Sequence, residues 1–292
     1  MIIHEPAAYR ANRPVTWCPG CGDARVLEAL CQALSRSGAD PAETVLVTGS
    51  GCSSLIGFFV NSYAIHGPYG RTLPIAMGVK LANPSLTVIA AGGDGDAYAA
   101  GAGHLVHLAR TNPDITWLIM DNGCYGLTKG QPSPTAGSVA DGAGAVDPAS
   151  LNPLALLIAA GATFVAQGSS DDPDLLIRLM QEAVRHRGFS VINILSPCVV
   201  FDRQSSSRPL EAPESLQPET VRPEVIRIDP AHPSHDRMAA LHLASNGDGR
   251  PRIGLFYREE RNPFPHDAAK KSEQNGYDDL ISLERIINGF KP

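Results

Sequence analysis

The sequence has no long hydrophobic run, no excess of basic charge and no apolar leader. Nowhere do as many as about eighteen apolar residues follow one another, so no membrane-spanning helix is expected. The opening residues, MIIHEPAAYRANRP, contain no apolar h-region, which argues against secretion. The net charge is −6 and no long basic run is present, which argues against a nucleic-acid surface. These absences predict a cytoplasmic chain that binds neither nucleic acid nor membrane.

Cysteine is scarce as well, with six residues in 292. In a cytosolic chain, six cysteines point to metal or redox sites rather than to structural disulfides. The length and a hydrophobic content of 43% allow a sizeable core, in one large or two small domains.

What is present is organised around one βαβ unit between residues 86 and 131. Two apolar runs, 86–91 and 115–120, read as buried parallel strands, and the small-residue stretch 97–110 between them reads as a crossover helix. The same alternation continues in further predicted strands (44–47, 163–167, 190–195) and helices (75–81, 148–160, 172–186). The pattern predicts an α/β fold, a doubly wound and mostly parallel sheet with helices on both faces.

Two polar residues follow the strands of this unit, Asp94 in a GDG turn and Asn122 after the second strand. Both therefore lie at the carboxyl edge of the sheet, where open α/β sheets bind ligands. A carboxylate, an amide oxygen and a turn carbonyl are too few to enclose Mg²⁺, which completes its coordination with water and phosphates. The backbone N–H groups of Gly95 and Asp96 would meet phosphate oxygens. The spacing predicts a metal-bound diphosphate; a GDG sequence alone is also typical of a simple tight turn.

Four cysteines lie in predicted loops or turns. Cys18 and Cys21 form a CxxC before a helix, Cys52 follows the strand at 44–47, and Cys198 follows the strand at 190–195. A CxxC is compatible with half a zinc site, a redox pair or half an iron–sulfur site, although the redox pair needs a preceding strand that is missing here. Cys31 lies on the apolar stripe of its helix and is predicted to be core. The four loop cysteines suffice for either a [4Fe–4S] cluster or a structural zinc ion.

The segment that begins at Gly92 resembles the β subunits of 2-oxoacid:ferredoxin oxidoreductases through GGDGDAYAAGAGH…DNGCYGLTKGQPSPT. The likeness is closest to the 2-oxoglutarate enzymes. The likeness covers residues 14–203 well, includes KLANP and GLFYREE, and is weak in the tail. It implies a thiamine-diphosphate-binding fold with Mg²⁺ on Asp94, Asn122 and the carbonyl of Cys124. It also implies a [4Fe–4S] cluster on the loop cysteines, namely Cys18, Cys21, Cys52 and Cys198.

The resemblance further implies which residues line thiamine diphosphate. These residues are Gly51, Cys52, Ser53, His66, Gly93, Gly95, Asp96, Tyr125, Gly126, Leu127 and Thr128. His66 would lie over the cofactor or at the substrate, although an isolated histidine is often structural. Lys129 would pair with the 2-oxoacid carboxylate, although it could also be a solvated surface lysine. Tyr69 stands where members of the family often have a second histidine, so a proton-transfer role at that position is in doubt.

The activity implied is the reversible oxidative decarboxylation of 2-oxoglutarate to succinyl-CoA, with electrons passed through the cluster to ferredoxin. Pyruvate and branched-chain 2-oxoacids are alternative substrates. A non-redox thiamine-dependent decarboxylase or synthase with structural zinc is a second alternative, and a non-enzymatic metal-binding subunit is a third. No glutamate matches the one that activates thiamine diphosphate, so the family likeness assigns it to an α subunit. We therefore expect a heteromer, (αβ)₂, whose β chain is inactive alone.

Two regions are predicted from composition. Residues 1–203 form the domain that binds thiamine diphosphate and Mg²⁺ and carries the iron–sulfur ligands. Residues 204–292 begin with a Ser- and Pro-rich connection and form an extension expected to contact a partner or the sister subunit. Within that extension only 253–257 and 278–287 have the apolar pattern of a strand and a helix, respectively.

Overall fold

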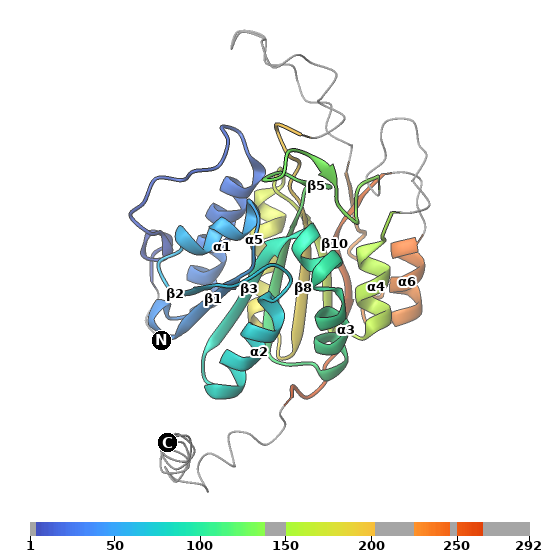
Figure 1. Cartoon of the computed structure of the whole chain (residues 1–292). Coiled ribbons are helices and arrows are strands. Elements are labelled where there is room, and N and C mark those ends of the chain that lie inside the picture. Colours follow the sequence, from blue (N-terminus) through green and yellow to red (C-terminus); the bar gives the residue numbers. More distant parts are fainter. Residues whose placement is uncertain (1–3, 138–149, 202–224, 246–249, 265–292) are drawn as a thin grey trace, which may run out of the picture.

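The computed structural model describes residues 4–137, 150–201, 225–245 and 250–264 (Figure 1). The predicted helix at 278–287 and the Ser- and Pro-rich connection at 204–222 lie outside these residues. No helix in the described ranges is both long and apolar enough to cross a membrane.

An eight-stranded sheet forms the centre, in the order β2-β1-β3-β4-β8-β7-β10-β9. Its strands are β1 (Thr44–Thr48), β2 (Tyr63–His66), β3 (Thr87–Gly93), β4 (Ile115–Asp121), β7 (Phe164–Ser169), β8 (Phe189–Leu195), β9 (Ile226–Arg227) and β10 (Arg252–Arg258). All neighbouring pairs are parallel except β10 with β7. A separate two-stranded hairpin consists of β5 (Cys124–Tyr125) and β6 (Gln131–Pro132).

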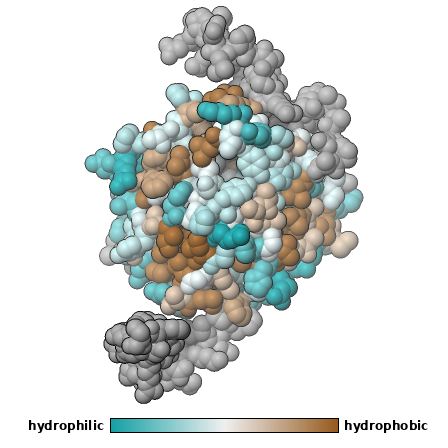
Figure 2. Space-filling model, in the orientation of Figure 1, coloured by the Kyte–Doolittle hydropathy of each residue, from teal (hydrophilic) through white to brown (hydrophobic). Residues whose placement is uncertain are grey.

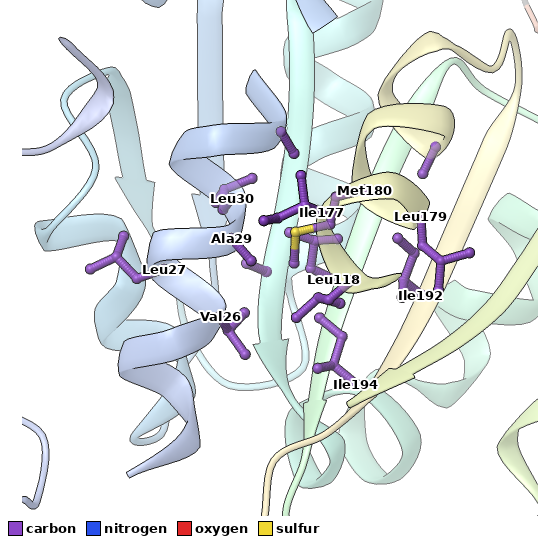
Figure 3. Packing of buried hydrophobic residues seen from close by; sticks show 14 of the residues in the cluster. Val26, Leu27, Ala29, Leu30, Leu118, Ile177, Leu179, Met180, Ile192 and Ile194 are labelled. Carbon is purple, nitrogen blue, oxygen red and sulfur yellow. The ribbon is translucent and has the colours of Figure 1, made fainter. Parts of the chain in front are cut away.

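Helices cover both faces of the sheet (Figure 1). On one face lie α1 (Gly22–Ser37) and α5 (Pro173–Arg185), and on the other lie α2 (Thr72–Ala82), α3 (Ala102–Thr111), α4 (Pro153–Ala160) and α6 (Arg237–Ser245). Figure 3 shows the first core, where apolar side chains of α1 and α5 pack on strand residues such as Leu118, Ile192 and Ile194. The predicted doubly wound α/β fold is confirmed.

The crossover helix predicted at 97–110 is divided in two. Residues Asp96–Ala100 form a π-helical turn, in which the Gly101 N–H donates to the Asp96 carbonyl at 2.9 Å, and α3 follows it. A Cβ at Gly101 would lie 2.5 Å from that carbonyl oxygen, so the turn requires glycine there. Such π-turns are frequent at functional sites.

The segment 58–84, for which the sequence predicts only a helix at 75–81, contains more structure than expected. The helix α2 begins at Thr72 because Pro74 lies in its first turn, where no intrahelical N–H donor is needed. The edge strand β2 was missed because all four of its residues are exposed, so its sequence has no apolar alternation.

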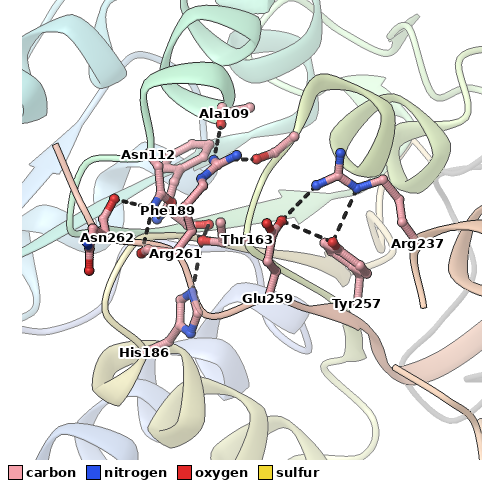
Figure 4. Close-up of polar contacts among 11 residues, drawn as sticks. Ala109, Asn112, Thr163, His186, Phe189, Arg237, Tyr257, Glu259, Arg261 and Asn262 are labelled. Atoms are coloured by element: carbon pink, nitrogen blue, oxygen red, sulfur yellow. Dashed lines mark hydrogen bonds and ion pairs between the residues drawn. The ribbon is translucent and has the colours of Figure 1, made fainter. Parts of the chain in front are cut away.

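Part of the predicted extension joins the sheet. In β10, Ile253, Phe256 and Tyr257 are buried, and Arg237 of α6 binds Glu259 at 2.7 Å. Figure 4 shows that Asn112, the left-handed residue that ends α3, connects the segment after β10 to the sheet. Its Nδ2 donates to the carbonyl oxygens of Arg261 and Asn262. These residues thus pack with the sheet; the boundary predicted at residue 203 stays a prediction.

Asn112 is expected to be a sensitive position for stability. Its Oδ1 accepts from the Thr163 hydroxyl at 2.7 Å and from the Phe189 N–H at 2.8 Å, both in the core. Asn112→Ala would leave these donors unpaired and force φ of 59° on alanine, so we expect a loss of about 2–4 kcal/mol. Asn112→Gly accommodates the φ and should lose less. Urea unfolding measures both, with the exposed Asn83→Ala as the control; equal stability of all three variants would contradict this role.

Candidate active site

Two of the predicted metal ligands follow neighbouring strands at the carboxyl edge of the sheet. Asp94 follows β3 and Asn122 follows β4, and these strands are hydrogen-bonded neighbours with Gly93 opposite Met120. Ser53 belongs to the same edge, since a Cβ on Gly93 would lie 3.6 Å from its hydroxyl. The GDG turn after β3 therefore lies beside the loops that follow β1 and β4, which are distant from it in sequence.

Asp94 is 1% exposed and belongs to a buried polar chain that the sequence did not predict. It accepts hydrogen bonds from the hydroxyls of Ser133 and Thr135, and the Thr135 oxygen also lies 2.7 Å from Asp121 Oδ1. A threonine hydroxyl has one hydrogen and can donate to only one of the two carboxylates. Burial and the neighbouring Asp121 raise the pKa of Asp94 to about 7, and burial also raises the pKa of Asp121.

This donor set fits a divalent cation. In the described part of the chain no lysine or arginine pairs with either of these two buried carboxylates, and a bound cation would supply the counter-charge. Asp121 Oδ2 accepts a hydrogen bond from Asn193 Nδ2 at 3.0 Å. Asn193 in turn accepts a hydrogen bond from the Tyr98 hydroxyl. Asp121 is therefore anchored in the core, while Asp94 lies at the loop.

Asn122 and Cys124 form the turn opposite Asp94. Asn122 is half-buried and its Oδ1 accepts from the Cys124 N–H at 3.0 Å, whereas Cys124 is buried. In this orientation the amide oxygen caps the turn. Ligation of Mg²⁺ by Asn122 and by the Cys124 carbonyl stays a prediction.

Asp96 connects loops through its side chain. Its carboxylate accepts from the Gly70 N–H at 2.7 Å, the Thr72 hydroxyl at 2.8 Å and the Ser50 N–H at 3.3 Å. A Cβ on Gly49 would overlap this carboxylate, so the loop after β1 approaches closely because glycine is present. The side chain of Asp96 is therefore occupied by these contacts, and binding of a phosphate by its backbone N–H stays a prediction.

The aromatic residues Tyr125 and Tyr69 hold the GDG turn from outside. A Cβ on Gly95 would overlap the Tyr125 ring, and the Tyr69 hydroxyl donates to the Gly95 carbonyl at 2.6 Å. Burial and the hydrogen bond with Tyr125 raise the pKa of Tyr69 well above its usual value. Tyr69 is thus a poor proton donor at neutral pH, consistent with the doubt about proton transfer at this position.

The loop 126–130 borders this turn. A Cβ on Gly126 would lie 3.2 Å from Cys52 Sγ, so the predicted cofactor loop approaches a cysteine loop. Leu127, Thr128 and Lys129 are exposed, and Lys129 has φ of 80°, which is left-handed and uncommon for a residue with a side chain. Gly51 has φ of 122° and open space around it.

His66 lies at the end of the edge strand. Its Nδ1 is 2.9 Å from the Thr48 hydroxyl, and its ring packs against Phe58 with centroids 5.1 Å apart. His66 lines an open pocket of about 530 Å³ together with Arg13 and other residues of the N-terminal arm. The pocket is wide enough for a small ligand. The role predicted for His66, at the cofactor or the substrate, stays a prediction.

The four loop cysteines come together at the same end of the sheet. Cys18 and Cys198 lie near enough to Cys21 and Cys52 for electrostatic repulsion to raise the pKa of both thiols. Burial raises the pKa of Cys21 to about 12 and raises that of Cys52. Among the described residues, no three His, Cys, Asp or Glu side chains are gathered closely enough to hold a metal as they stand. Metal coordination would deprotonate the thiols and reverse the effect of burial.

Backbone N–H groups lie near two of these four thiols. The Phe201 N–H donates to Cys198 Sγ at 3.3 Å, and the Asp23 N–H is near enough to the Cys21 thiol to lower its pKa. Cys31, in contrast, is 2% exposed in the core between α1 and α5, as predicted. Burial also raises the pKa of Asp23, whereas the hydroxyl groups of Ser196 and Ser53 lower it.

Comparisons with known proteins agree with this geometry. Residues 49–194 match the family described as thiamine pyrophosphate enzyme, C-terminal TPP binding domain. The chain is 40% identical over 291 residues to a 2-oxoacid:ferredoxin oxidoreductase β subunit of Aeropyrum pernix, covering 98% of this chain and 91% of that one. It is 37% identical to the 2-oxoglutarate synthase subunit KorB of Methanothermobacter marburgensis, covering 76% and 80%.

A solved structure, the 2-oxoglutarate:ferredoxin oxidoreductase of Magnetococcus marinus with 2-oxoglutarate, coenzyme A and succinyl-CoA bound, superposes with a TM-score of 0.81 at 35% identity. The superposition covers 99% of this chain and 97% of that chain. Fold and site thus define a thiamine pyrophosphate enzyme domain of an oxidoreductase. The chain belongs to the family of 2-oxoacid:ferredoxin oxidoreductase β subunits, as its sequence motifs predict.

Proposed function

We propose that this chain binds thiamine diphosphate, Mg²⁺ and a [4Fe–4S] cluster and, with an α subunit, oxidatively decarboxylates 2-oxoglutarate to succinyl-CoA. Ferredoxin takes the electrons, and the reaction is reversible. One observation carries the proposal: the loop that follows the candidate magnesium turn approaches a cysteine loop, with Gly126 against Cys52 Sγ. A cofactor loop beside a thiol cluster is the arrangement that electron transfer out of a thiamine enzyme needs.

The residues of this chain have distinct tasks in that reaction. Bound thiamine diphosphate supplies a nucleophilic carbon and an electron sink. Asp94, Asn122 and the Cys124 carbonyl hold Mg²⁺, and the N–H groups at the start of the π-turn bind phosphate oxygens. Tyr69 and Tyr125 keep the GDG turn in place through their contacts with Gly95.

The electron path is assigned to the four thiols. Cys18, Cys21, Cys52 and Cys198 would ligate the [4Fe–4S] cluster, which would supply one-electron chemistry. The backbone N–H of Phe201, which donates to Cys198 Sγ at 3.3 Å, supports this assignment. A structural zinc ion on the same thiols is the competing assignment, and metal analysis separates the two.

An α subunit is proposed as the partner that completes the site and contributes the activating glutamate. The naming of the relatives as β subunits supports such a partner. An apolar surface supports an assembly such as (αβ)₂: Tyr63 and Ile65 of β2 are 68% and 39% exposed, and Leu81 of α2 is 45% exposed. Figure 2 shows apolar residues gathered on the face that carries α2. Surface patches of this kind mark protein interfaces.

Turnover of a panel of 2-oxoacids by the co-expressed α and β chains tests the proposed function. With coenzyme A and ferredoxin present, 2-oxoglutarate should give the highest kcat/KM, and the isolated β chain should be inactive. A preference for pyruvate or a branched-chain oxoacid would change the substrate but keep the class. Decarboxylation without ferredoxin reduction would overturn the redox assignment.

Lys129 is predicted to bind the oxoacid carboxylate. Lys129→Gly removes the charge while accommodating the φ of 80°. A charge-assisted hydrogen bond contributes about 1.5–3 kcal/mol, so we expect KM for the oxoacid to rise roughly 10- to 100-fold with little change in thiamine diphosphate affinity. Lys129→Arg, which keeps the charge, serves as the control. Equal losses in oxoacid and cofactor affinity would remove this assignment.

A further inference from the structure

A buried carboxylate lies among the segments that carry the four loop cysteines. Asp23 is 2% exposed, in the first turn of α1 and two positions after Cys21. Neither lysine nor arginine pairs with it in the described part of the chain. A buried carboxylate without a cation is costly unless hydrogen bonds compensate, so its partners show what it is for.

Those partners come from the two other cysteine segments. Ser196 donates to Asp23 Oδ1 at 2.7 Å, and it follows β8, two positions before Cys198. The hydroxyl of Ser53, the residue after Cys52, is near enough to this carboxyl group to lower its pKa. One side chain thus lies among all three segments: the CxxC turn, the loop after β1 and the loop after β8.

The backbone around Asp23 is built for this contact. A Cβ on Gly22 would lie 2.5 Å from Ser196 Oγ and 2.7 Å from Ser170 Oγ, so a larger residue there would have to displace these hydroxyls. The Asp23 N–H is near enough to the Cys21 thiol to lower its pKa, and the position in the first helical turn favours a negative charge. The residue therefore contacts one thiol through its backbone and two cysteine loops through its side chain.

We propose that Asp23 is the positioning residue of the iron–sulfur site: it fixes the three cysteine segments relative to one another and keeps the reduction potential of the cluster low. The inference rests on the proposed function, because the cluster itself is part of that proposal. Net charge and hydrogen bonding around the sulfurs set the potential of such clusters. A carboxylate beside them disfavours the added electron and so favours its transfer to a low-potential ferredoxin.

Asp23→Asn in the co-expressed αβ complex tests the inference, since it keeps the shape and removes the charge. Iron content and far-UV circular dichroism should match wild type. The midpoint potential, followed by EPR during redox titration, should rise by about 59 mV, which corresponds to a tenfold change in the reduction equilibrium. Asp23→Ala also deletes the carboxylate that the Ser196 and Ser53 hydroxyls face. This variant should lose at least half of the iron and retain thiamine diphosphate binding, measured by calorimetry.

Glu28→Gln is the matched control, because it removes one negative charge from the exposed side of the same helix. It should change neither iron content nor potential. A wild-type complex without iron would overturn the proposed cluster, whereas a wild-type cluster whose potential is unchanged in Asp23→Asn would overturn the role of Asp23 alone. If the asparagine variant fails to fold, Ser196→Ala replaces it, with iron loss expected and full iron at the wild-type potential counting against the inference.

Discussion

Asp94→Asn is expected to reduce turnover of the αβ complex by about 10²–10³-fold and to abolish calorimetric binding of thiamine diphosphate with Mg²⁺. Asp94 is the one carboxylate at the GDG turn that is both buried and adjacent to a second carboxylate through Thr135. An amide removes the charge that a divalent cation requires but preserves the volume. The iron content should not change, since the cysteine segments are separate from this side chain.

A control and a second variant accompany this substitution. Asp174→Asn changes an exposed acid in the first turn of α5 and should leave binding and turnover as in wild type. Thr135→Val keeps the shape but removes the shared hydroxyl, so it should weaken Mg²⁺ binding by roughly 10- to 100-fold, as expected for a group that orients a ligand. Normal cofactor affinity in Asp94→Asn would mean that the metal is held elsewhere.

The raised pKa of Asp94 gives this site a pH dependence with a definite sign. Its folded pKa of about 7 lies above the ordinary value, so in the metal-free chain its contribution to stability is present at low pH and is lost as the pH rises through 7. A cation requires the deprotonated form, so Mg²⁺ should stabilise the chain more at pH 8 than at pH 6. Thermal unfolding with and without Mg²⁺ and thiamine diphosphate measures both trends; the Mg²⁺ effect should shrink in Asp94→Asn.

The sequence predicts those parts of the molecule that depend on local patterns. The crossover between β3 and β4 places Asp94 and Asn122 at one edge, because a βαβ unit has parallel strands whatever its details. Strand ends likewise placed Cys52 and Cys198 in loops at that same edge. Both arguments need only hydrophobic periodicity and the direction of the chain.

The remaining features depend on contacts between distant positions. Thr135 meets Asp94 across 41 positions, and Ser196 meets Asp23 across 173. Asp121 begins the DNGCYGLTKGQ motif and Asp23 follows the CxxC by two positions, but nothing in either spacing marks these side chains as buried and hydrogen-bonded. The π-turn was missed for another reason: one added residue barely changes a helical periodicity.

Cys198→Ser should separate the redox assignment from the zinc alternative. We expect the complex to lose its iron and its ferredoxin reduction, since three thiolates cannot hold a [4Fe–4S] cluster as four do. Thiamine diphosphate binding should persist, because Asp94 and its partners lie on other loops. Iron and zinc analysis, visible absorbance and ferredoxin reduction are measured on the same preparation, purified without oxygen.

Cys31→Ala is the control that makes this result specific to the cluster. Cys31 is a free thiol in the core whose Sγ lies 3.6 Å from the Tyr9 carbonyl oxygen. Its replacement should cost stability, about 1–2 kcal/mol, but no iron. A colourless wild-type complex with one zinc per β chain, lost in Cys198→Ser and kept in Cys31→Ala, would replace the cluster by a structural zinc site. Iron kept in Cys198→Ser would mean that a fourth ligand other than Cys198 completes the cluster.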